Sequence, residues 1–554
     1  MTEIDLRRRA EQERERQSGF AGRVFCCGGA SCVTSGSQAV YKALRASLAS
    51  RSEIECVSTG CMGLCSRGPL VRVEIGGGEP SLYTHATPDL AESLARSPDQ
   101  PRNVETRRFP LSHPFFAKQT RIVLATLDRN DPTNLDHYLA SGGYEALASA
   151  LAGWTPAEIC AEIAKSGLRG RGGAGYPTAA KWDLVRKAPD PVKFAVVNGD
   201  EGDPGAYMDR TIMEDDPHRV LEGVLIAAYA VGARTAYLYV RGEYPLAVER
   251  LRRAIDDARR AGLVGANILG ARFSCDVEVR IGAGAYVCGE ETALIASIEG
   301  GRGTPRVRPP YPPEHGVCGR PTLINNVETY ANVPSVLRDG AERFAAVGSS
   351  GGKGTKVFSV TGALRNSGLI EVPMGIPLRE IVYDMCEAVE GGVKAVQTGG
   401  PSGGCVPAEM FDLPVDYESL QKAGSIMGSG GMVVLGAETD MVGLAKYFMD
   451  FCRDESCGKC VPCRVGTVQM SRLLDRIHRG EGSLDDLDLL EEMCEVVRAA
   501  SLCGLGQAAP NPVLGALRYF RREFLDKVAG RRRPRPAGDL SHMILAAPHG
   551  GFGT

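Results

Sequence analysis

The chain has 554 residues, with 64 basic and 67 acidic side chains and a net charge of −3. That length allows several domains, and the nearly balanced charge gives no reason to expect nucleic acid or an anionic membrane as a partner. Apolar stretches are far shorter than the roughly 20 residues of a membrane-spanning helix. The charged N-terminus shows no apolar signal region, so we expect a cytoplasmic protein without a transmembrane segment.

The first part of the chain predicts a small α/β domain over residues 1–100. A charged helix opens it, and residues 20–87 alternate strands and cysteine-bearing loops with one helix (SQAVYKALRASLAS). The stretch SPDQPRNVETRRFPLSHP that follows has the composition of a linker. From 115 to 345, helices alternate with strands such as KFAVVN, TAYLYV and CDVEVRI, which predicts a large α/β domain with glycine-rich turns on its rim.

The rest of the chain predicts two smaller units. Residues 353–436 combine short strands, GG and PSGG turns and one helix (LREIVYDMCEAV), which is typical of a small α+β insert. Over 439–530, the segments MVGLAKYFMDFC, VGTVQMSRLLDRIHR, LDDLDLLEEMCEVVRA and VLGALRYFRREFLDKV predict an antiparallel helix bundle. Residues 531–554 are expected to form a tail. The fold class predicted is a multidomain α/β protein.

Eighteen cysteines without a secretion signal are better explained by metal ligation or burial than by disulfides. In ESCGKCVPCR, three cysteines stand at x2, x2 spacing, and the cysteine of SLCGLG can complete a [4Fe–4S] ligand set. A four-cysteine zinc site is the alternative, although such sites usually present two separated C-x-x-C pairs. Lys459 and Arg464 either raise the potential of the cluster or are simply solvated. The predicted ligands are Cys457, Cys460, Cys463 and Cys503.

A second group of cysteines lies on two glycine-rich loops of the first domain, CCGGASC and GCMGLCSRGP. Two short loops can meet around a [2Fe–2S] rhomb, with backbone amides turned toward the sulfurs. A dithiol redox site is the alternative, but it requires a C-x-x-C spacing that these loops lack. Cys26 could replace Cys27, whereas Cys56 lies on a strand and is expected in the core. The predicted ligands are Cys27, Cys32, Cys61 and Cys65.

Residues 166–182 (SGLRGRGGAGYPTAAKW) contain a G-x-G-x-x-G pattern, which is a weak signal on its own. The dinucleotide fingerprint requires a preceding strand, whereas a capped helix is predicted here, so an ordinary Rossmann site is disfavoured. The glycines still admit a phosphate close to backbone amides. Arg171 and Lys181 would supply positive charge, and Tyr176 would supply a stacking surface.

Three further polar loops lie near predicted strands: 198–205 (NGDEGDPG), 282–291 (GAGAYVCGEE) and 322–326 (TLINN). In open α/β sheets, ligands bind at the carboxyl ends of the strands, so these loops are expected to converge. Carboxylates and Asn in the acidic loop could bind ribitol or ribose hydroxyls or a flavin ring; a solvated or cation-binding turn is the alternative. Four polar loops at one sheet edge predict a large polar cofactor.

The motifs SGLRGRGGAGYPTAAKW, NGDEGDPG, YVCGEETAL, RPPYP, PTLINNVET and ESCGKCVPCR...SLCGLG together closely resemble the 51 kDa-type, FMN-bearing NADH-oxidising subunit of respiratory complex I and its soluble relatives. The resemblance implies a Rossmann-like FMN and NADH domain, a ubiquitin-like β-grasp (SLBB-like) insert and a four-helix bundle with a [4Fe–4S] cluster. It also implies hydride transfer between NAD(H) and FMN and single-electron transfer to the clusters, with no protein acid or base. It places FMN at Gly170, Arg171, Gly172, Lys181, Asn198, Asp200, Glu201, Gly289, Glu290, Asn325 and Asn326. It places NAD(H) at Tyr176, Asp203, Glu291, Arg308 and Tyr311.

Two positions depart from the complex I pattern: Asp203 replaces a glutamate, and Arg308 stands where lysine is common. The activity is expected to survive, while the preference for NADH or NADPH stays open. The first 100 residues resemble the thioredoxin-like [2Fe–2S] domain that soluble relatives fuse to this subunit. They are most similar to the diaphorase flavoprotein of NAD-reducing bidirectional [NiFe] hydrogenases, and next to the β subunit of NAD-dependent formate dehydrogenases. Since no cysteine follows Cys503, a bifurcating subunit with an extra ferredoxin domain is not expected.

The expected partners are a small [2Fe–2S] diaphorase subunit and a hydrogenase or formate dehydrogenase module. One alternative is a non-catalytic assembly subunit, which the intact Gly, Lys and Glu positions of the flavin loops oppose. Another is a free-standing diaphorase that reduces quinones or dyes, which a cluster-bearing bundle facing a partner disfavours. The sequence leaves open whether the [2Fe–2S] cluster is a branch, a store or an exit for electrons.

Overall fold

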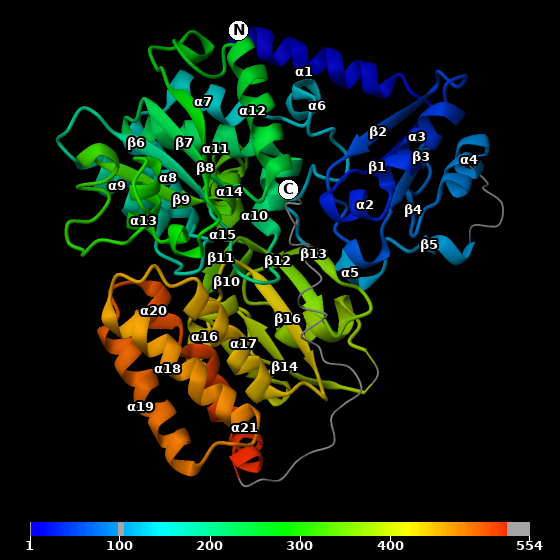
Figure 1. The fold of residues 1–554 in the computed structure, drawn as a ribbon. Coiled ribbons are helices and arrows are strands. Elements are labelled where there is room, and N and C mark those ends of the chain that lie inside the picture. The colour runs from blue at the N-terminus through cyan, green and yellow to red at the C-terminus, as the bar shows by residue number, and fades with distance from the viewer. Residues whose placement is uncertain (1, 98–104, 390, 529–554) are drawn as a thin grey trace, which may run out of the picture.

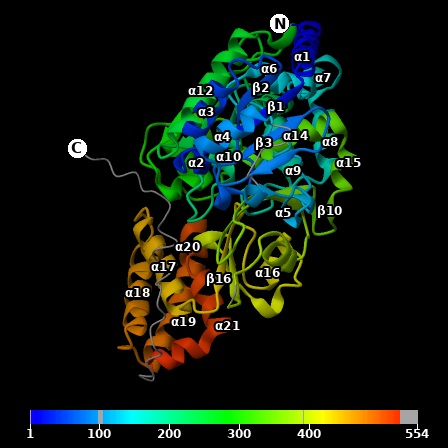
Figure 2. The ribbon, with the colours of Figure 1, turned by 90° about the vertical axis from the view of Figure 1, so that its right-hand side faces the viewer.

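The fold is described from a computed structural model, which describes residues 2–97, 105–389 and 391–528. The predicted tail at 531–554 and residues 98–104 of the predicted linker lie outside this part of the chain. Figure 1 shows the N-terminal domain on the right, the large α/β domain at upper left, and the insert and the helix bundle beneath. In the turned view of Figure 2, the bundle and the insert lie side by side below the other two units.

The N-terminal domain is built on a mixed sheet. Its elements are β1 (Gly22–Cys27), α2 (Ala30–Thr34), α3 (Ser37–Ser47), β2 (Ile54–Thr59), β3 (Val71–Ile75), β4 (Ser81–Tyr83), α4 (Pro88–Arg96) and β5 (Arg108–Phe109). The strand order is β2-β1-β3-β4-β5, with β1 and β2 parallel and the other neighbours antiparallel. The stretch predicted as a linker therefore supplies an edge strand, β5. Neighbouring residues of a strand point to opposite faces, so Cys26 packs beneath α3 while Cys27 faces the insert.

Helix α1 (Glu3–Ser18) precedes this sheet but packs on the large α/β domain. Thr2 and Asp5 form a capping box at its start. Leu6 and Ala10 are fully buried in the core of the α/β domain, although the sequence groups the helix with residues 1–100. The first helix therefore links the two domains.

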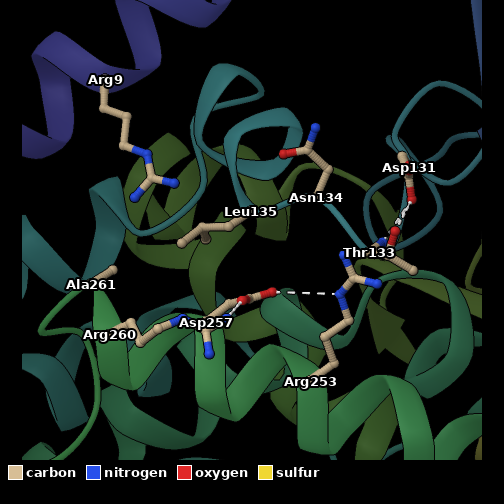
Figure 3. A pocket seen from close by; sticks show the side chains of 9 residues that line it. All are labelled: Arg9, Asp131, Thr133, Asn134, Leu135, Arg253, Asp257, Arg260 and Ala261. Carbon is tan, nitrogen blue, oxygen red and sulfur yellow. Dashed lines mark hydrogen bonds and ion pairs between the residues drawn. The ribbon is translucent and has the colours of Figure 1, made fainter.

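A polar hollow lies between α1, the loop before α6 (Leu135–Ala140) and α12 (Pro245–Arg260), as Figure 3 shows. Arg9 reaches into it from α1 and donates to Asp136 at 3.2 Å. On α12, Asp257 pairs with Arg260 and lies 3.8 Å from Arg253. The pair of Arg9 with Asp136 therefore helps to hold α1 in place at this hollow.

The large α/β domain is built on a parallel sheet. Its other elements are α5 (Pro114–Ala117), α7 (Glu145–Gly153), α8 (Pro156–Ser166), α9 (Thr178–Lys187), β6 (Phe194–Gly199), α10 (Met208–Asp215), α11 (Pro217–Val231), β7 (Thr235–Arg241), β8 (Asp276–Gly282), α13 (Glu291–Ile298), β9 (Thr322–Asn326), α14 (Val327–Asp339) and α15 (Ala341–Ala345). The order is β8-β7-β6-β9, and all neighbouring strands run parallel. The apolar helix α11 is buried along nearly its whole length. Since the strands are parallel, their carboxyl ends meet at one edge.

A five-stranded mixed sheet and a two-stranded sheet, β10-β11, make up the strands of the insert. Its elements are β10 (Gly348–Ser349), β11 (Gly352–Lys353), β12 (Thr355–Gly362), β13 (Gly368–Pro373), β14 (Val393–Thr398), β15 (Gly404–Pro407), α16 (Tyr417–Lys422) and β16 (Gly431–Gly436). The order is β13-β12-β16-β14-β15, with β12 and β16 parallel. The helix predicted over 378–389 is instead a shorter π-helical segment, Glu380–Met385. The Cys386 amide donates to the Ile381 oxygen at 3.0 Å, and this wider turn places Ile381, Val382 and Met385 in the core.

The C-terminal bundle contains α17 (Met441–Asp454), α18 (Val461–His478), α19 (Leu484–Ala500), α20 (Gly504–Ala508) and α21 (Asn511–Val528). The helices predicted from the apolar spacing are confirmed, and their apolar stripes meet in one core. Among the described residues, no helix is both long and apolar enough to cross a membrane.

Candidate cofactor site

The loops that follow β6 and β8 are tied together at the carboxyl edge of the parallel sheet. Asn198 donates from Nδ2 to the backbone oxygen of Gly289 at 2.9 Å, and its Oδ1 accepts the amide of Asp200 at 3.1 Å. Gly172 of the glycine loop lies against the end of β9, where an added Cβ would come within 3.0 Å of the Asn326 Cβ. The structure thus brings together loops that the sequence predicted to converge.

Two carboxylates in these loops each have a buried oxygen without a hydrogen-bond partner among the described residues. Asp200 Oδ1 accepts from Arg241 at 2.9 Å, whereas its buried Oδ2 has no hydrogen-bond partner among the described residues. Glu290 Oε2 caps α13, and its Oε1 likewise has no hydrogen-bond partner within the described ranges. Burial raises the pKa of Asp200 to about 7, and Arg241 opposes that shift. Buried polar atoms are normally satisfied, so these oxygens indicate the place of a ligand.

Charged side chains of Lys181, Glu291 and Arg308 stand beside Glu290. Lys181 Nζ lies 2.5 Å from Glu291 Oε1. Arg308 Nη1 lies 3.8 Å from Glu291 Oε2 and 3.7 Å from Glu290 Oε1, both longer than a hydrogen bond. Lys181 is held by Glu291 and by the Ile324 oxygen at 3.0 Å, whereas Arg308, with no contact shorter than 3.7 Å to these carboxylates, can turn toward a phosphate.

The side chains predicted to hold NAD(H) differ in their surroundings. Tyr176 and Tyr311 are 49% and 52% exposed, so both rings can stack on a base. Asp203 instead accepts hydrogen bonds from the Tyr286 hydroxyl at 2.7 Å and the Ser429 hydroxyl at 3.1 Å. Burial raises the pKa of Asp203, and these hydroxyls oppose the shift. Its carboxylate joins the acidic loop to the insert.

The side chains of Arg171 and Glu201, two of the predicted FMN residues, are hydrogen-bonded within the protein. The Arg171 guanidinium is fully buried and donates to backbone oxygens of β11 and β12 at 2.6 and 3.0 Å. It ties the glycine loop to the insert. The Glu201 carboxylate accepts the first backbone amides of α10 at 3.0 and 2.9 Å, so it caps that helix.

The paired amides at the end of β9 also serve the surrounding structure. Asn325 accepts a hydrogen bond from the buried Trp182 indole at 3.1 Å. Asn326 caps α14 through the Glu328 amide at 2.9 Å and donates to Asp209. Their backbone and remaining polar atoms lie at the sheet edge, while their side chains fix the loop.

Arg241 and Tyr286 also belong to the site, although the motifs in the sequence do not indicate them. Arg241 ends β7 and binds Asp200, Glu243 and the Gly284 oxygen. Arg241 lies at the carboxyl end of β7, level with the start of the acidic loop that follows β6. Because ligands bind at the carboxyl ends of parallel strands, this position alone could have marked Arg241 as a site residue. Tyr286 lies inside the polar loop 282–291, but nothing in the sequence indicates that its hydroxyl binds Asp203.

The cysteines of the bundle line a single small hollow, together with Val287, Pro305 and Leu505. In the part of the chain that the structure describes, no three His, Cys, Asp or Glu side chains are close enough to hold a single metal ion. The donor set therefore fits a cluster better than zinc, which requires sulfur ligands at about 2.3 Å. The thiols that line the hollow are those of Cys457, Cys460, Cys463 and Cys503.

This cysteine site packs directly against the loop that follows β8. Cys463 and Cys503 share an apolar cluster with side chains of β6 and of residues 286–289. The amide of Tyr286 donates to Glu455 at 2.9 Å, which fixes the loop to the start of the cysteine segment. The site of the predicted [4Fe–4S] cluster and the Glu290 carboxylate thus adjoin the same turn.

Lys459 and Arg464 are exposed to solvent beside these cysteines, and each donates one hydrogen bond to a backbone oxygen. Lys459 Nζ donates to the Pro305 oxygen at 2.5 Å, and Arg464 donates to the Gly458 oxygen at 2.9 Å. Both positive charges are therefore held near the thiolates that a cluster would carry.

The second cysteine group also comes together, at the junction of the N-terminal domain with the rest of the chain. The sulfurs of Cys61 and Cys65 lie 3.9 Å apart, and hydrogen bonding to Cys32 raises the pKa of Cys27 well above its usual value. Cys26 points away and donates to a backbone oxygen of α3 at 3.7 Å. Cys56 packs on the same side as Cys26. The thiols that gather are those of Cys27, Cys32, Cys61 and Cys65.

Comparisons with known proteins point to the same regions. Residues 163–335 match the Nuo51 FMN-binding domain, and residues 443–527 match the NADH-ubiquinone oxidoreductase-F iron-sulfur binding region. The HndC subunit of the NADP-reducing hydrogenase of Solidesulfovibrio fructosivorans is 49% identical over 419 residues, covering 75% of this chain and 85% of the relative. The F 2 subunit of the NADH-quinone oxidoreductase of Rhizobium meliloti is 45% identical, with coverages of 74% and 99%. The structure of NAD+-reducing [NiFe]-hydrogenase in the H2-reduced state aligns with a TM-score of 0.66 at 31% identity, covering 95% of this chain and 87% of that chain.

Both matched regions coincide with the sites built above: the FMN-binding region spans the polar loops, and the iron–sulfur region spans the bundle cysteines. The identity to HndC extends over most of that relative. The chain therefore belongs to the family of NAD(H)-linked oxidoreductase subunits that combine a Nuo51 FMN-binding domain with an NADH-ubiquinone oxidoreductase-F iron-sulfur binding region.

Proposed function

We propose that this chain is the electron-input flavoprotein of a larger redox complex, working between NAD(H), FMN and iron–sulfur clusters. FMN, when bound, supplies the exchange of a hydride with the nicotinamide and the release of single electrons. The observation that carries the proposal is the turn at 286–290, which adjoins both the free Glu290 oxygen and the bundle cysteines. A flavin bound there would lie next to the cluster that takes its electrons.

The residues divide into those that face FMN and those that position them. Asp200 Oδ2 and Glu290 Oε1 are buried acceptors for flavin or ribityl donors, and Lys181 supplies charge near the glycine loop. We assign Gly170, Gly172, Lys181, Asn198, Asp200, Gly289 and Glu290 to direct contact with FMN. Arg171, Glu201, Asn325 and Asn326 act by fixing the loops.

For NAD(H), Tyr176 and Tyr311 supply exposed rings, and Glu291 and Arg308 supply polar groups. Asp203 contributes by holding Tyr286 in place. One relative is named as NADP-reducing and another as part of an NADH-quinone oxidoreductase. Measuring kcat/KM with NADH and with NADPH in parallel will show which of the two nucleotides this chain prefers.

The second cluster and the finer domain assignments belong to the same proposal. Cys27, Cys32, Cys61 and Cys65 fit a [2Fe–2S] cluster, because their thiols gather at a buried junction. The strand order β2-β1-β3-β4 supports a thioredoxin-like N-terminal domain. The order β13-β12-β16-β14-β15, with its central strands parallel, supports a β-grasp insert.

The terminal partner that we favour is a hydrogenase module, reached through a small [2Fe–2S] subunit, in the cytoplasm. The likeness to the NAD+-reducing [NiFe]-hydrogenase covers 95% of this chain and so includes the N-terminal domain. A formate dehydrogenase module is the second candidate, since the sequence resembles the β subunit of those enzymes as well. A non-catalytic assembly role is opposed by the match of residues 163–335 to the Nuo51 FMN-binding domain, whose loops keep the buried carboxylates of Asp200 and Glu290.

The affinity for FMN should rise with pH. Asp200 has a pKa of about 7 in the FMN-free chain, and only its ionised form offers two acceptor oxygens. The ionised fraction rises from roughly one tenth at pH 6 to nine tenths at pH 8, so we expect a gain of about tenfold in affinity. Quenching of FMN fluorescence by deflavinated protein measures it.

Asp200→Asn provides the baseline, because the phosphate of FMN itself titrates near pH 6. The variant should bind FMN more weakly and should lack the part of the pH dependence that belongs to Asp200. Equal pH profiles for the two proteins would remove Asp200 from the FMN site. Failure of both to bind FMN would overturn the proposed function.

A further inference from the structure

A buried carboxylate of the α/β domain contacts the loop that carries Cys61 and Cys65. Asp215, the last residue of α10, accepts the backbone amide of Cys61 at Oδ2, 2.8 Å away. Its Oδ1 accepts from Arg250 at 2.6 Å. The Asp215 side chain is 0% exposed, and that of Arg250 is 12% exposed. Gly60 permits this approach, since a Cβ there would come within 2.5 Å of the Asp215 Cβ.

The cysteine loop is also held from the side of the insert. The amide of Leu369 donates to the Gly63 oxygen at 2.7 Å, and the amide of Ser66 donates to the Ser367 oxygen at 3.0 Å. The loop is therefore fixed between two domains. The position of the Asp215 carboxylate relative to the Cys61 thiol is correspondingly fixed.

We propose that Asp215 and Arg250 set the reduction potential of the cluster at Cys27, Cys32, Cys61 and Cys65, with Asp215 lowering it and Arg250 raising it. The inference rests on the proposed [2Fe–2S] site. Reduction adds one negative charge to the cluster, which a buried carboxylate beside the ligand loop disfavours and a guanidinium favours. Asp215 also takes up the Cys61 amide, a donor that could otherwise stabilise the reduced sulfurs.

This arrangement assigns control of the N-terminal cluster to the domain that binds FMN. Helix α10 begins at the amides capped by Glu201 of the acidic loop and ends at Asp215. One short helix thus connects the flavin loops to the second cysteine site. Asp215 and Arg250 are positioning and tuning residues, since neither ligates the cluster.

The test is an anaerobic redox titration of the full chain followed by EPR, with the [4Fe–4S] signal of the same sample as internal reference. Asp215→Asn keeps the shape and an acceptor for the Cys61 amide but removes the charge. We expect the one-electron reduction equilibrium to become about tenfold more favourable, a rise of about 59 mV in midpoint potential. Arg250→Gln should shift the same signal in the opposite direction by a similar factor.

Asp216→Asn is the matched control, because this neighbouring buried carboxylate bonds Thr126 at 2.9 Å and has no bond to the cysteine loop. It should leave the potential of the [2Fe–2S] cluster nearly unchanged. Shifts of equal sign in Asp215→Asn and Arg250→Gln, or no shift in a loaded cluster, overturn the inference. If Asp215→Asn does not retain its cluster, Arg250→Gln tests the inference alone: a lower midpoint potential supports it, and a higher one overturns it. A wild-type chain that binds FMN and shows only the [4Fe–4S] signal overturns the second cluster itself.

Discussion

Replacing Lys356 with methionine is expected to lower the free energy of unfolding by about 3–5 kcal/mol, because it leaves the carboxylate of Glu328 buried without its countercharge. The side chains of Lys356 and Glu328 are 0% and 1% exposed and form a very short ion pair. Lys356 Nζ also donates to the backbone oxygens of Val357 and Ser429, both at 2.7 Å. Lys356 lies on β12 of the insert and Glu328 on α14, so the pair holds two domains together.

Denaturant unfolding under anaerobic conditions, read at the transition that separates the insert from the α/β domain, measures this loss. Lys165→Met is the control: Lys165 pairs with Glu342 on the surface, with side chains 53% and 69% exposed. Such exposed pairs contribute about 0–1 kcal/mol, so the control should change little. Similar losses in the two variants would show that the buried pair contributes nothing beyond an ordinary surface contact.

Replacing Cys27 with serine should remove the N-terminal cluster, whereas the same change at Cys26 should leave it intact. The two cysteines are neighbours on β1 and therefore face opposite sides of the sheet. Cys27 lies with Cys32 and Cys61, while Cys26 is buried beneath α3. The loss of a ligand thiolate at a buried junction exposes the cluster to hydrolysis, so we expect about two fewer iron atoms per chain.

Iron analysis and the EPR signal of the reduced protein distinguish the two variants. Cys27→Ser should lose the [2Fe–2S] signal and keep that of the [4Fe–4S] cluster. Cys26→Ser should match the wild type in both, with a modest loss of stability. The reverse result would move the ligand to Cys26 and require β1 to pair in a register shifted by one residue.

The elements with strong local patterns could be predicted from the sequence. The strands KFAVVN and TAYLYV appear as β6 and β7, and the bundle helices appear close to the predicted residues. These segments combine correct periodicity with recognisable ends, and they are buried on the faces that the pattern indicates. Cysteines that share one loop could be grouped for the same reason, since their spacing is local, whereas the pairing of distant loops is formed by the tertiary structure.

The features that sequence reasoning missed depend on partners far along the chain. Arg171 was expected to meet a phosphate, but it binds backbone oxygens of β11 and β12, more than 180 residues later. Backbone carbonyls leave no residue-specific trace in a sequence, so this contact could not be foreseen. The packing of α1 on the α/β core and the π-helical turn at Glu380–Met385 have the same origin, because tertiary contacts override local preference.

Tertiary contacts also decide the different roles of two neighbouring carboxylates in the acidic loop. Asp200 and Glu201 are adjacent and chemically alike, yet one keeps a free buried oxygen and the other caps α10. The two roles differ because backbone amides of α10 approach Glu201, whereas Arg241 approaches Asp200. The sequence does not indicate these contacts.

The most direct test of the proposed function is the visible spectrum of anaerobically purified protein before and after addition of NADH, with FMN and iron quantified in the same sample. We expect about one FMN and about six iron atoms per chain, with a flavin band that NADH bleaches. Colourless protein, or protein that holds zinc and takes up no FMN on reconstitution, would contradict the role as an electron-input flavoprotein and favour a structural role.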